Sequence, residues 1–508
     1  MDKENNARNK NLKETVPIVT PSSNTTPNDK AYRESHAWFT DNDGTPLFIS
    51  EGISLGLIAQ LYVFERLAPN AGTQTMSGNI AVKLKELGYD WHAKFLTGRL
   101  HHSAKPPSQV IKEKKIAILY DVRSQAILDS NNAIARALLS NGVEPIALLS
   151  DPGMLSLMDP KLPAINYSAF YGLKDEVQSL RQWKSIHKTL NEVHPLLVER
   201  FSAFLNGDHK KAIALVDFLY PFFRQALRDI IAIQRLAENL NISKIVMGSD
   251  SHRLSRLFAL MGSQHSWRTL VIQHGAPMAP DAYVPVFADT IAVWGECSYD
   301  WFLSYNTPPE RMKITGNPRY DHLRAVLQAP ASSDSRIVLL TNLFDPDLRD
   351  TILNIAFDAA CSLKLPLVIK IHPSEQTDAY YKFARRNSPI PIHIHFREKI
   401  DQVIRAGDMV VTVSSTSGIE ALLLGASLHH IAVDNIANTI PFEEFQAATF
   451  ARTTDDLINN LTLELSGKID ISYRHECVSR LLNYYLCEID GRSSERIINV
   501  INGLSEDE

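Results

Sequence analysis

A run of hydroxyl side chains follows a buried strand in the last third of the chain. The segment VTVSSTSGIEAL, which starts at Val411, leads from an apolar strand into a glycine-containing turn that opens a helix. Backbone N–H groups at a helix N-terminus favour phosphate, and neighbouring hydroxyls add further donors. We therefore predict a phosphate-binding loop in this turn. Its members are Ser414, Ser415, Thr416, Ser417 and Gly418, with Glu420 as an acceptor for ribose hydroxyls.

The same hydroxyl-rich segment has a purely structural interpretation as well. In it, Ser417 caps the helix and Glu420, three residues later, completes a capping box. One cap does not need four consecutive hydroxyls, so the pattern favours phosphate binding.

A second polar group stands at the end of another buried strand, in the segment VIKIHPSE that starts at Val368. His372 precedes Pro373, which holds its backbone extended, so the imidazole can point out of the sheet and donate to a phosphate oxygen. Lys370, His372 and Pro373 are thus predicted to bind a phosphorylated donor such as a nucleotide. A histidine satisfied by neighbouring backbone groups is the alternative.

Acid and imidazole side chains also follow strands in the first half of the chain. Asp250 comes shortly after the strand that ends at Met247, and His274 follows the strand that ends at Ile272. Transfer of a group to a hydroxyl needs a carboxylate or an imidazole to accept the proton, or a nucleophilic carboxylate. We predict Asp250 and His274 as catalytic residues, although Asp250 could instead cap the next helix. Residues predicted to line the same cleft are Gln273, Gly275, Gly316, Asn317 and Arg253.

No metal site is predicted. His393 and His395 alternate on a strand, but no carboxylate or cysteine signature accompanies them. The acidic pair in Asp345-Pro-Asp347 is expected to cap the following helix.

The elements that position these residues alternate between short apolar runs and helical patterns. Such alternation predicts parallel, doubly wound α/β sheets, which bind ligands at the carboxyl ends of their strands. Two successive arrays are visible. Strands are predicted at 115–120, 145–149, 244–247, 269–272, 290–293 and 312–315 in the first array, and at 336–340, 367–371, 393–396, 409–413 and 428–433 in the second.

The chain of 508 residues is longer than one hydrophobic core usually supports. We predict two Rossmann-like domains that face a central cleft, with additional segments around them. The predicted boundaries are a disordered tail (1–35), an accessory helical segment (36–108), an N-terminal domain (109–328) with a helical insertion (173–240), a C-terminal domain (329–470) and a C-terminal helix (471–508).

Composition excludes several classes of protein. The formal net charge is −5, so the chain has no overall electrostatic attraction for nucleic acid. Its four cysteines show no close Cys-x-x-Cys spacing, which fits a reducing cytoplasm. No stretch reaches the roughly 20 apolar residues that span a bilayer, and the first 30 residues contain no apolar signal-peptide core. Any membrane association is therefore expected to be peripheral, at the inner face of the cytoplasmic membrane.

Taken in order, these motifs resemble bacterial surface and capsular polysaccharide glycosyltransferases of the GT-B fold, over about residues 115–433. The His-Pro motif at His372 followed by the Ser-Ser-Thr motif is similar to that of CMP-sugar users, the Kdo transferases and sialyltransferases. The resemblance implies that His372 and the serines hold the CMP phosphate, and that Asp250 is the catalytic carboxylate. Where sialyltransferases have two acids and a glycine, this chain has Gly248-Ser249-Asp250, which departs from their pattern.

The resemblance implies transfer of an acidic sugar from a CMP-linked donor to a surface polysaccharide or glycolipid, with no cofactor beyond the donor. A glycan-assembly complex would be a further partner. CDP-glycerol transferases also carry a His-Gly turn and a Ser-rich helix start, so CDP or UDP donors stay open. A UDP-sugar 2-epimerase, which needs no acceptor, and a non-catalytic nucleotide-sugar binding protein are also compatible with these motifs.

Overall fold

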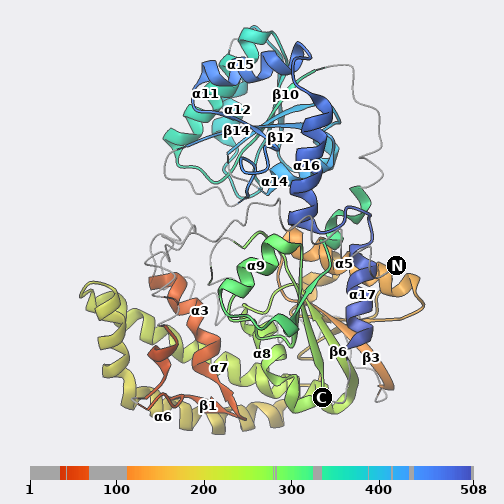
Figure 1. Cartoon of the computed structure of the whole chain (residues 1–508). Coiled ribbons are helices and arrows are strands. Elements are labelled where there is room, and N and C mark those ends of the chain that lie inside the picture. The colour runs from red at the N-terminus through yellow and green to blue at the C-terminus, as the bar shows by residue number, and fades with distance from the viewer. Residues whose placement is uncertain are drawn as a thin grey trace. The chain divides into compact units, whose positions relative to one another are not determined.

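The computed structural model of the chain describes residue 32 and residues 35–41, 43–67, 111–277, 280, 283–323, 335–386, 388–413, 416–433 and 440–504. Two compact units make up the chain. We call them the N-terminal domain (Ser23–Trp294, Ser298–Arg319 and Ser493–Glu508) and the C-terminal domain (Gly295–Cys297 and Tyr320–Arg492). Each contains one parallel sheet flanked by helices (Figure 1).

The N-terminal domain is built on a seven-stranded sheet with the order β5-β4-β3-β6-β7-β8-β9. Every pairing in it is parallel. Strands such as β4 and β8 are buried at every position, as expected for a sheet covered on both faces. The strand order reverses between β3 and β6, which is where such sheets bind ligands. The strands are β3 (Ile111–Tyr120), β4 (Ile146–Leu149), β5 (Ala164–Asn166), β6 (Leu240–Met247), β7 (Arg268–Ile272), β8 (Thr290–Val293) and β9 (Met312–Ile314).

Helices cover both faces of this sheet. Side chains of α5 and α17 share one core with the sheet, and those of α6, α7 and α8 share the other. The predicted insertion is a hairpin of two long helices, α6 and α7, and its aromatic residues Phe218, Phe222 and Phe223 are buried. The helices are α5 (Gln125–Ser140), α6 (Leu173–Phe204), α7 (His209–Asn239), α8 (Arg253–Met261), α9 (Glu296–Ser304) and α17 (Ser493–Gly503).

Part of the predicted accessory segment joins the same core. It comprises η1 (Ser35–Phe39), β1 (Ile49–Ser50), β2 (Ile53–Ser54) and α3 (Leu55–Leu67). Phe48 and Phe64 are buried in the core that contains α7. Residues 68–110, and all of the predicted tail except residues 32 and 35, lie outside the described residues.

The C-terminal domain repeats the plan with a six-stranded parallel sheet, in the order β12-β11-β10-β13-β14-β15. Its order reverses between β10 and β13. The strands are β10 (Ile337–Leu340), β11 (Leu367–Lys370), β12 (Ile392–His395), β13 (Met409–Thr412), β14 (Ser427–Ile431) and β15 (Thr449–Ala451). The helices are α11 (Pro346–Leu363), α12 (Asp378–Ala384), α13 (Ile400–Val403), α14 (Ser417–Leu423), α15 (Thr454–Leu465) and α16 (Ile471–Leu486).

Two details of the C-terminal domain bear on the sequence predictions. Asp345 caps α11, because its carboxylate accepts the backbone N–H groups of Asp347 and Leu348, as predicted. The predicted C-terminal helix is divided into α16 and α17, with Cys487 at a positive φ of 63° directly after α16. α17 packs on α5 and so belongs to the N-terminal domain.

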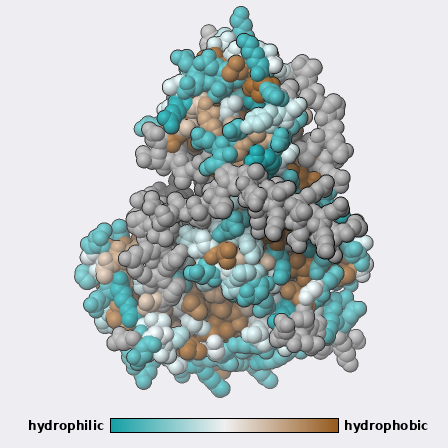
Figure 2. Space-filling view, in the orientation of Figure 1, coloured by the Kyte–Doolittle hydropathy of each residue, from teal (hydrophilic) through white to brown (hydrophobic). Residues whose placement is uncertain are grey.

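The strand orders confirm the predicted class of fold, two Rossmann-like α/β domains in one chain, which is the domain content of the GT-B class. In the described parts of the chain, no helix combines the length and the apolar character needed to cross a membrane. The visible surfaces of both domains are mainly hydrophilic, with scattered hydrophobic patches (Figure 2).

Candidate active site

In the C-terminal domain, polar residues gather where β10 and β11 end. His372 follows β11, and its backbone N–H donates to the hydroxyl of Thr341, which follows β10, at 2.9 Å. The backbone N–H of Ser374 donates to Nδ1 of His372 at 3.2 Å. Nδ1 is therefore an acceptor, and in the neutral ring the proton lies on Nε2. Among the described residues Nε2 has no hydrogen-bond partner, so it can donate to a ligand at this edge of the sheet.

The charge state of His372 follows from its surroundings. Burial lowers the pKa of His372 below its usual value, and Lys370 lowers it further, while Glu375 opposes both. The ring is therefore neutral near pH 7 and acts as a hydrogen-bond donor rather than as a cation. A neutral donor suits a phosphate that must be released after reaction.

A carboxylate network fixes the loop that carries His372. Glu375 accepts hydrogen bonds from the hydroxyls of Thr341 and Tyr380, the latter at 2.6 Å. The hydroxyl of Thr341 thus connects the carboxylate of Glu375 with the backbone N–H of His372. Sequence reasoning missed Thr341 and Tyr380. Thr341 could have been found, because it directly follows an apolar strand of the same sheet.

Lys370 does not present its ammonium group to a ligand. Its Nζ donates to the backbone carbonyls of Ile371 at 2.9 Å and Phe396 at 3.0 Å, and the side chain is buried. Burial lowers the pKa of Lys370, which Glu398 and Glu420 partly offset. Through these two bonds Lys370 joins the ends of β11 and β12. The sequence instead predicted that Lys370 binds the donor.

A substitution of Lys370 tests this assignment. Lys370→Met is expected to lower the free energy of unfolding by about 1–3 kcal/mol, because two carbonyls lose their donor. Nucleotide affinity should stay unchanged. Urea denaturation and nucleotide titration measure the two effects. A loss of nucleotide affinity without a loss of stability would show that Lys370 contacts the ligand.

The predicted phosphate loop is only partly described. Ser414 and Ser415 lie outside the described residues. α14 begins at Ser417, and its N-cap residue is Thr416, whose side chain caps no backbone N–H. The N-cap thus lies one residue before the predicted Ser417.

Gly418 and Glu420 have defined structural surroundings on α14. A Cβ on Gly418 would lie 2.9 Å from Cζ of Phe442, so close packing alone requires glycine there. Glu420 is buried and accepts a hydrogen bond from the hydroxyl of Tyr320 at 3.0 Å. Pro373 is exposed in the turn after β11.

In the N-terminal domain, the side chain of Asp250 is bound to the backbone of the protein itself. It is buried, and Oδ2 accepts the backbone N–H groups of Phe287 at 2.6 Å and Ala288 at 3.0 Å. Burial raises the pKa of Asp250, and the two N–H groups and Arg256 offset part of the shift. These contacts tie the loop after β6 to the segment before β8. They favour a positioning role over the predicted catalytic one.

Three of the predicted cleft residues are also engaged with the protein itself. The side chain of Gln273 donates to the carbonyl of Gly275 and the hydroxyl of Ser298, each at 2.9 Å, and accepts the backbone N–H of Trp294. Arg253 pairs with Asp229 at 2.8 Å. The amide of Gln273 and the Nε–H of Arg253 are therefore used in contacts within the protein.

The remaining cleft predictions follow β9. Gly316 has a positive φ of 83°, which favours glycine. Asn317 is buried, and its Oδ1 accepts the backbone N–H of Arg319 at 3.1 Å, whereas Nδ2 has no hydrogen-bond partner in the described parts of the chain. Asn317 therefore keeps one donor available at the carboxyl edge of the sheet.

His274 is held against an aromatic ring. Its imidazole stacks on Tyr283, with the ring centroids 4.9 Å apart and the planes inclined by 14°. Glycine at position 275 permits this stacking, because a Cβ there would lie 2.8 Å from the Tyr283 hydroxyl and collide with it. Burial lowers the pKa of His274 to about 4, and the neighbouring His252 contributes. His252 likewise has a pKa of about 4, lowered by burial and then by Arg256.

The residue that sequence reasoning missed in this domain is Asp121. It directly follows β3, and thus lies at the point where the strand order of the sheet reverses. Both of its carboxylate oxygens are buried, and neither makes a well-formed hydrogen bond with the residues that the structure describes. Burial raises the pKa of Asp121 to about 7, since the facing hydroxyl and N–H of Ser255 offset only part of the cost.

Further charged and polar groups surround Asp121. The hydroxyl of Tyr62, on α3, accepts the backbone N–H of Arg253 at 2.8 Å. Tyr62 lies close enough to Asp121, Arg253 and Arg256 for their charges to act on its pKa, which burial raises. Titratable groups with strongly shifted pKa values, gathered at the ends of β3, β6 and β7, are typical of a catalytic site. No group of three or more His, Cys, Asp or Glu in the described residues could hold a metal ion.

Comparison with known proteins adds only weak similarities. No family model matches the sequence, and neither does any curated protein. Among solved structures, UDP-GlcNAc 2-epimerase from Neisseria meningitidis bound to UDP-GlcNAc is 13% identical, covers 77% of this chain and 100% of that chain, and has a TM-score of 0.49. A glycosyltransferase from Rickettsia africae is 10% identical, covers 78% and 100%, and has a TM-score of 0.45.

A third similar structure is Alr3699/HepE of Anabaena in complex with UDP and glucose. It is 11% identical, covers 77% of this chain and 100% of that chain, and has a TM-score of 0.44. Similarities this weak identify neither a reaction nor a substrate. Function must therefore be argued from the residues of this chain.

Proposed function

We propose that this protein is a nucleotide-sugar-dependent glycosyltransferase in which Asp121 accepts the proton of the acceptor hydroxyl. The observation that carries the proposal is the buried carboxylate of Asp121 at the reversal point of the N-terminal sheet, which makes no well-formed hydrogen bond with any described residue. An unpaired buried carboxylate is costly, and such strain is expected where a reaction needs it. A base with a pKa of about 7 matches proton transfer at neutral pH.

In this proposal the C-terminal domain binds the donor. Nε2–H of His372 donates to a phosphate oxygen of the nucleotide, with the hydroxyl-rich turn before α14 as the second contact. The acceptor oxygen loses its proton to Asp121 and bonds to the anomeric carbon, while the bond from that carbon to the phosphate oxygen breaks and the nucleotide leaves. His372 stabilises the negative charge that develops on the leaving phosphate.

We also propose which activated sugar is the donor. The succession of His372-Pro373 and the hydroxyl-rich turn supports a CMP-linked sugar of the acidic type, with a surface glycan or glycolipid as acceptor. UDP-sugar and CDP-glycerol donors are tested alongside it. The same residues would also serve a UDP-sugar 2-epimerase, which forms its product without an acceptor.

Nucleotide binding is tested with His372→Ala. Loss of one charge-assisted hydrogen bond is worth about 1.5–3 kcal/mol, so the affinity for the preferred nucleotide should fall roughly 10–100-fold. A thermal-shift panel of CMP, CDP, UDP, GDP and ADP identifies that nucleotide, because a ligand that binds only the folded state stabilises it.

The matched control for this test is His393→Ala, since His393 is exposed on β12 and has no predicted role. Its nucleotide affinity should equal that of the wild type. Equal nucleotide affinities of the His372→Ala variant and the wild type would show that His372 does not bind the donor.

A further inference from the structure

The first half of α6 carries an exposed surface that the proposed function does not use. Three apolar side chains stand out from it: Leu173 is 74% exposed, Val177 49% and Leu180 39%. Their spacing of four and three residues places them on one side of the helix, because an α-helix has 3.6 residues per turn. Single exposed apolar residues are common, but an aligned row of three marks an interaction surface.

Basic residues share this side of the helix. Lys174, Arg181 and Lys184 are exposed, and none of the three has an ion-pair partner among the described residues. Lys188, one turn further on, is also exposed and pairs with Glu192 at 3.8 Å. With 3.6 residues per turn, all four fall on the same side as the apolar row. We call these seven residues, Leu173, Lys174, Val177, Leu180, Arg181, Lys184 and Lys188, the α6 surface.

The acidic residues near the α6 surface are already engaged. Glu176 is paired with Arg228 at 2.6 Å, and it accepts the hydroxyl of Tyr171. Glu51 accepts a hydrogen bond from the neutral side chain of Gln182, so its charge offsets at most one of the three unpaired basic groups. The α6 surface therefore keeps a net positive charge.

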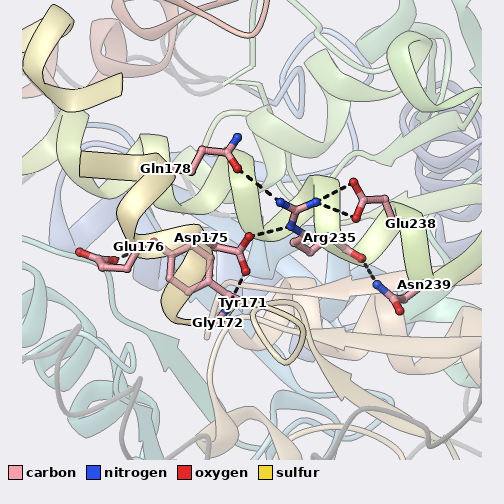
Figure 3. Close-up of polar contacts among 8 residues, drawn as sticks. All are labelled: Tyr171, Gly172, Asp175, Glu176, Gln178, Arg235, Glu238 and Asn239. Carbon is pink, nitrogen blue, oxygen red and sulfur yellow. Dashed lines mark hydrogen bonds and ion pairs between the residues drawn. The ribbon is translucent and has the colours of Figure 1, made fainter. Parts of the chain in front are cut away.

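An ion-pair network holds the start of α6 in place (Figure 3). Asp175 accepts the backbone N–H of Gly172 at 2.8 Å and also pairs with Arg235 of α7 at 2.7 Å. Arg235 in turn pairs with Glu238 at 2.8 Å, and its Nη2 donates to Gln178 at 3.3 Å. This network fixes the rotation of the helix, so the apolar row cannot turn inward to be buried.

From this surface we infer that α6 docks on an anionic lipid bilayer. Apolar side chains that alternate with unpaired basic groups on one face of a helix match the boundary between acyl chains and negatively charged headgroups. Nucleic acid would use the basic groups but not the apolar row. The apolar row would suit a protein partner, but such a surface would not need three unpaired cations.

Vesicle sedimentation with the purified full chain tests this inference independently of any enzymatic activity. The wild type should sediment with mixed phosphatidylglycerol–phosphatidylcholine vesicles and not with phosphatidylcholine alone, and added salt should release it. The triple variant Lys174→Gln/Arg181→Gln/Lys184→Gln should bind on the order of 100-fold more weakly. The variant Leu173→Ser/Val177→Ser/Leu180→Ser should also lose binding, by at least about tenfold.

The control replaces apolar residues of similar exposure elsewhere. Leu463 and Leu465 on α15 are 45% and 44% exposed, so Leu463→Ser/Leu465→Ser should bind vesicles like the wild type. Thermal melts of all variants verify folding. Wild-type binding by both triple variants, or no binding of the wild type to anionic vesicles, would overturn the inference. So would sedimentation velocity showing a wild-type dimer that the apolar triple variant cannot form.

Discussion

Replacing Asp121 by Asn is expected to lower kcat by about 10²–10⁴, the usual contribution of a general base. The amide has nearly the same shape as the carboxylate but cannot accept the proton of the acceptor. The wild type should also lose kcat/KM as the pH falls below about 7, since protonation of Asp121 removes the base. This acidic limb should be absent from the residual activity of the variant.

The same substitution is expected to stabilise the fold. The pKa of Asp121 is about 7 in the folded protein, above the ordinary value of 3.8. At a pH between these two pKa values, the folded state therefore binds more protons than the unfolded state. The carboxylate therefore costs stability as the pH rises through this window, and the full cost is present above about pH 7. Asp121→Asn should raise the free energy of unfolding at pH 8 by a few kcal/mol and change it little at pH 4.

The matched control is Asp250→Asn. Its amide oxygen can still accept the N–H groups of Phe287 and Ala288, so turnover should stay within about tenfold of the wild type. If instead Asp250→Asn abolishes turnover while Asp121→Asn leaves it intact, the catalytic carboxylate is Asp250.

Asp229→Ala is expected to cause the largest loss of stability. Asp229 is buried and accepts three hydrogen bonds, from Tyr167 at 2.7 Å, Gln225 at 2.7 Å and Arg253 at 2.8 Å. Its removal leaves the buried guanidinium of Arg253 without a counter-charge, which should lower the free energy of unfolding by about 3–5 kcal/mol. Because Arg253 begins α8, next to His252, the loop after β6 should also lose its position.

Chemical denaturation measures this loss, with Asp217→Ala on the same helix as the control. Asp217 is exposed and lies 3.9 Å from His194, so its substitution should change the free energy of unfolding by less than about 0.5 kcal/mol. A loss below about 1 kcal/mol for Asp229→Ala would show that the buried pair does not hold α7 to α8.

The sequence predicted the sheets well, for a definite physical reason. Strands buried on both faces of a parallel sheet are continuous apolar runs, as at 290–293 and 337–340, and they stand out from the helices between them. The edge strands β5 and β15 were not predicted, because neither is a continuous apolar run. The division between α16 and α17 was also missed. Two residues with positive φ, Cys487 and Gly491, lie in the segment between these helices.

The site was harder to predict, because it depends on contacts between residues far apart in the sequence. Asp121 and Asp250 both follow strands of the first array. The two differ in their contacts: Asp250 accepts two backbone N–H groups, from Phe287 and Ala288. Asp121 faces the hydroxyl and N–H of Ser255 but makes no well-formed hydrogen bond with a described residue. Lys370 is a similar case, since its ammonium group is turned toward the carbonyl of Phe396, 26 residues away.

The most direct test of the account is nucleotide release from a panel of CMP-, CDP- and UDP-linked sugars, measured with and without a surface-glycan acceptor fraction. We predict release that requires the acceptor, that is lost in Asp121→Asn and that is weakened in His372→Ala. Formation of an epimerised nucleotide sugar without any acceptor, or nucleotide binding with no turnover under either condition, would contradict the assignment as a glycosyltransferase.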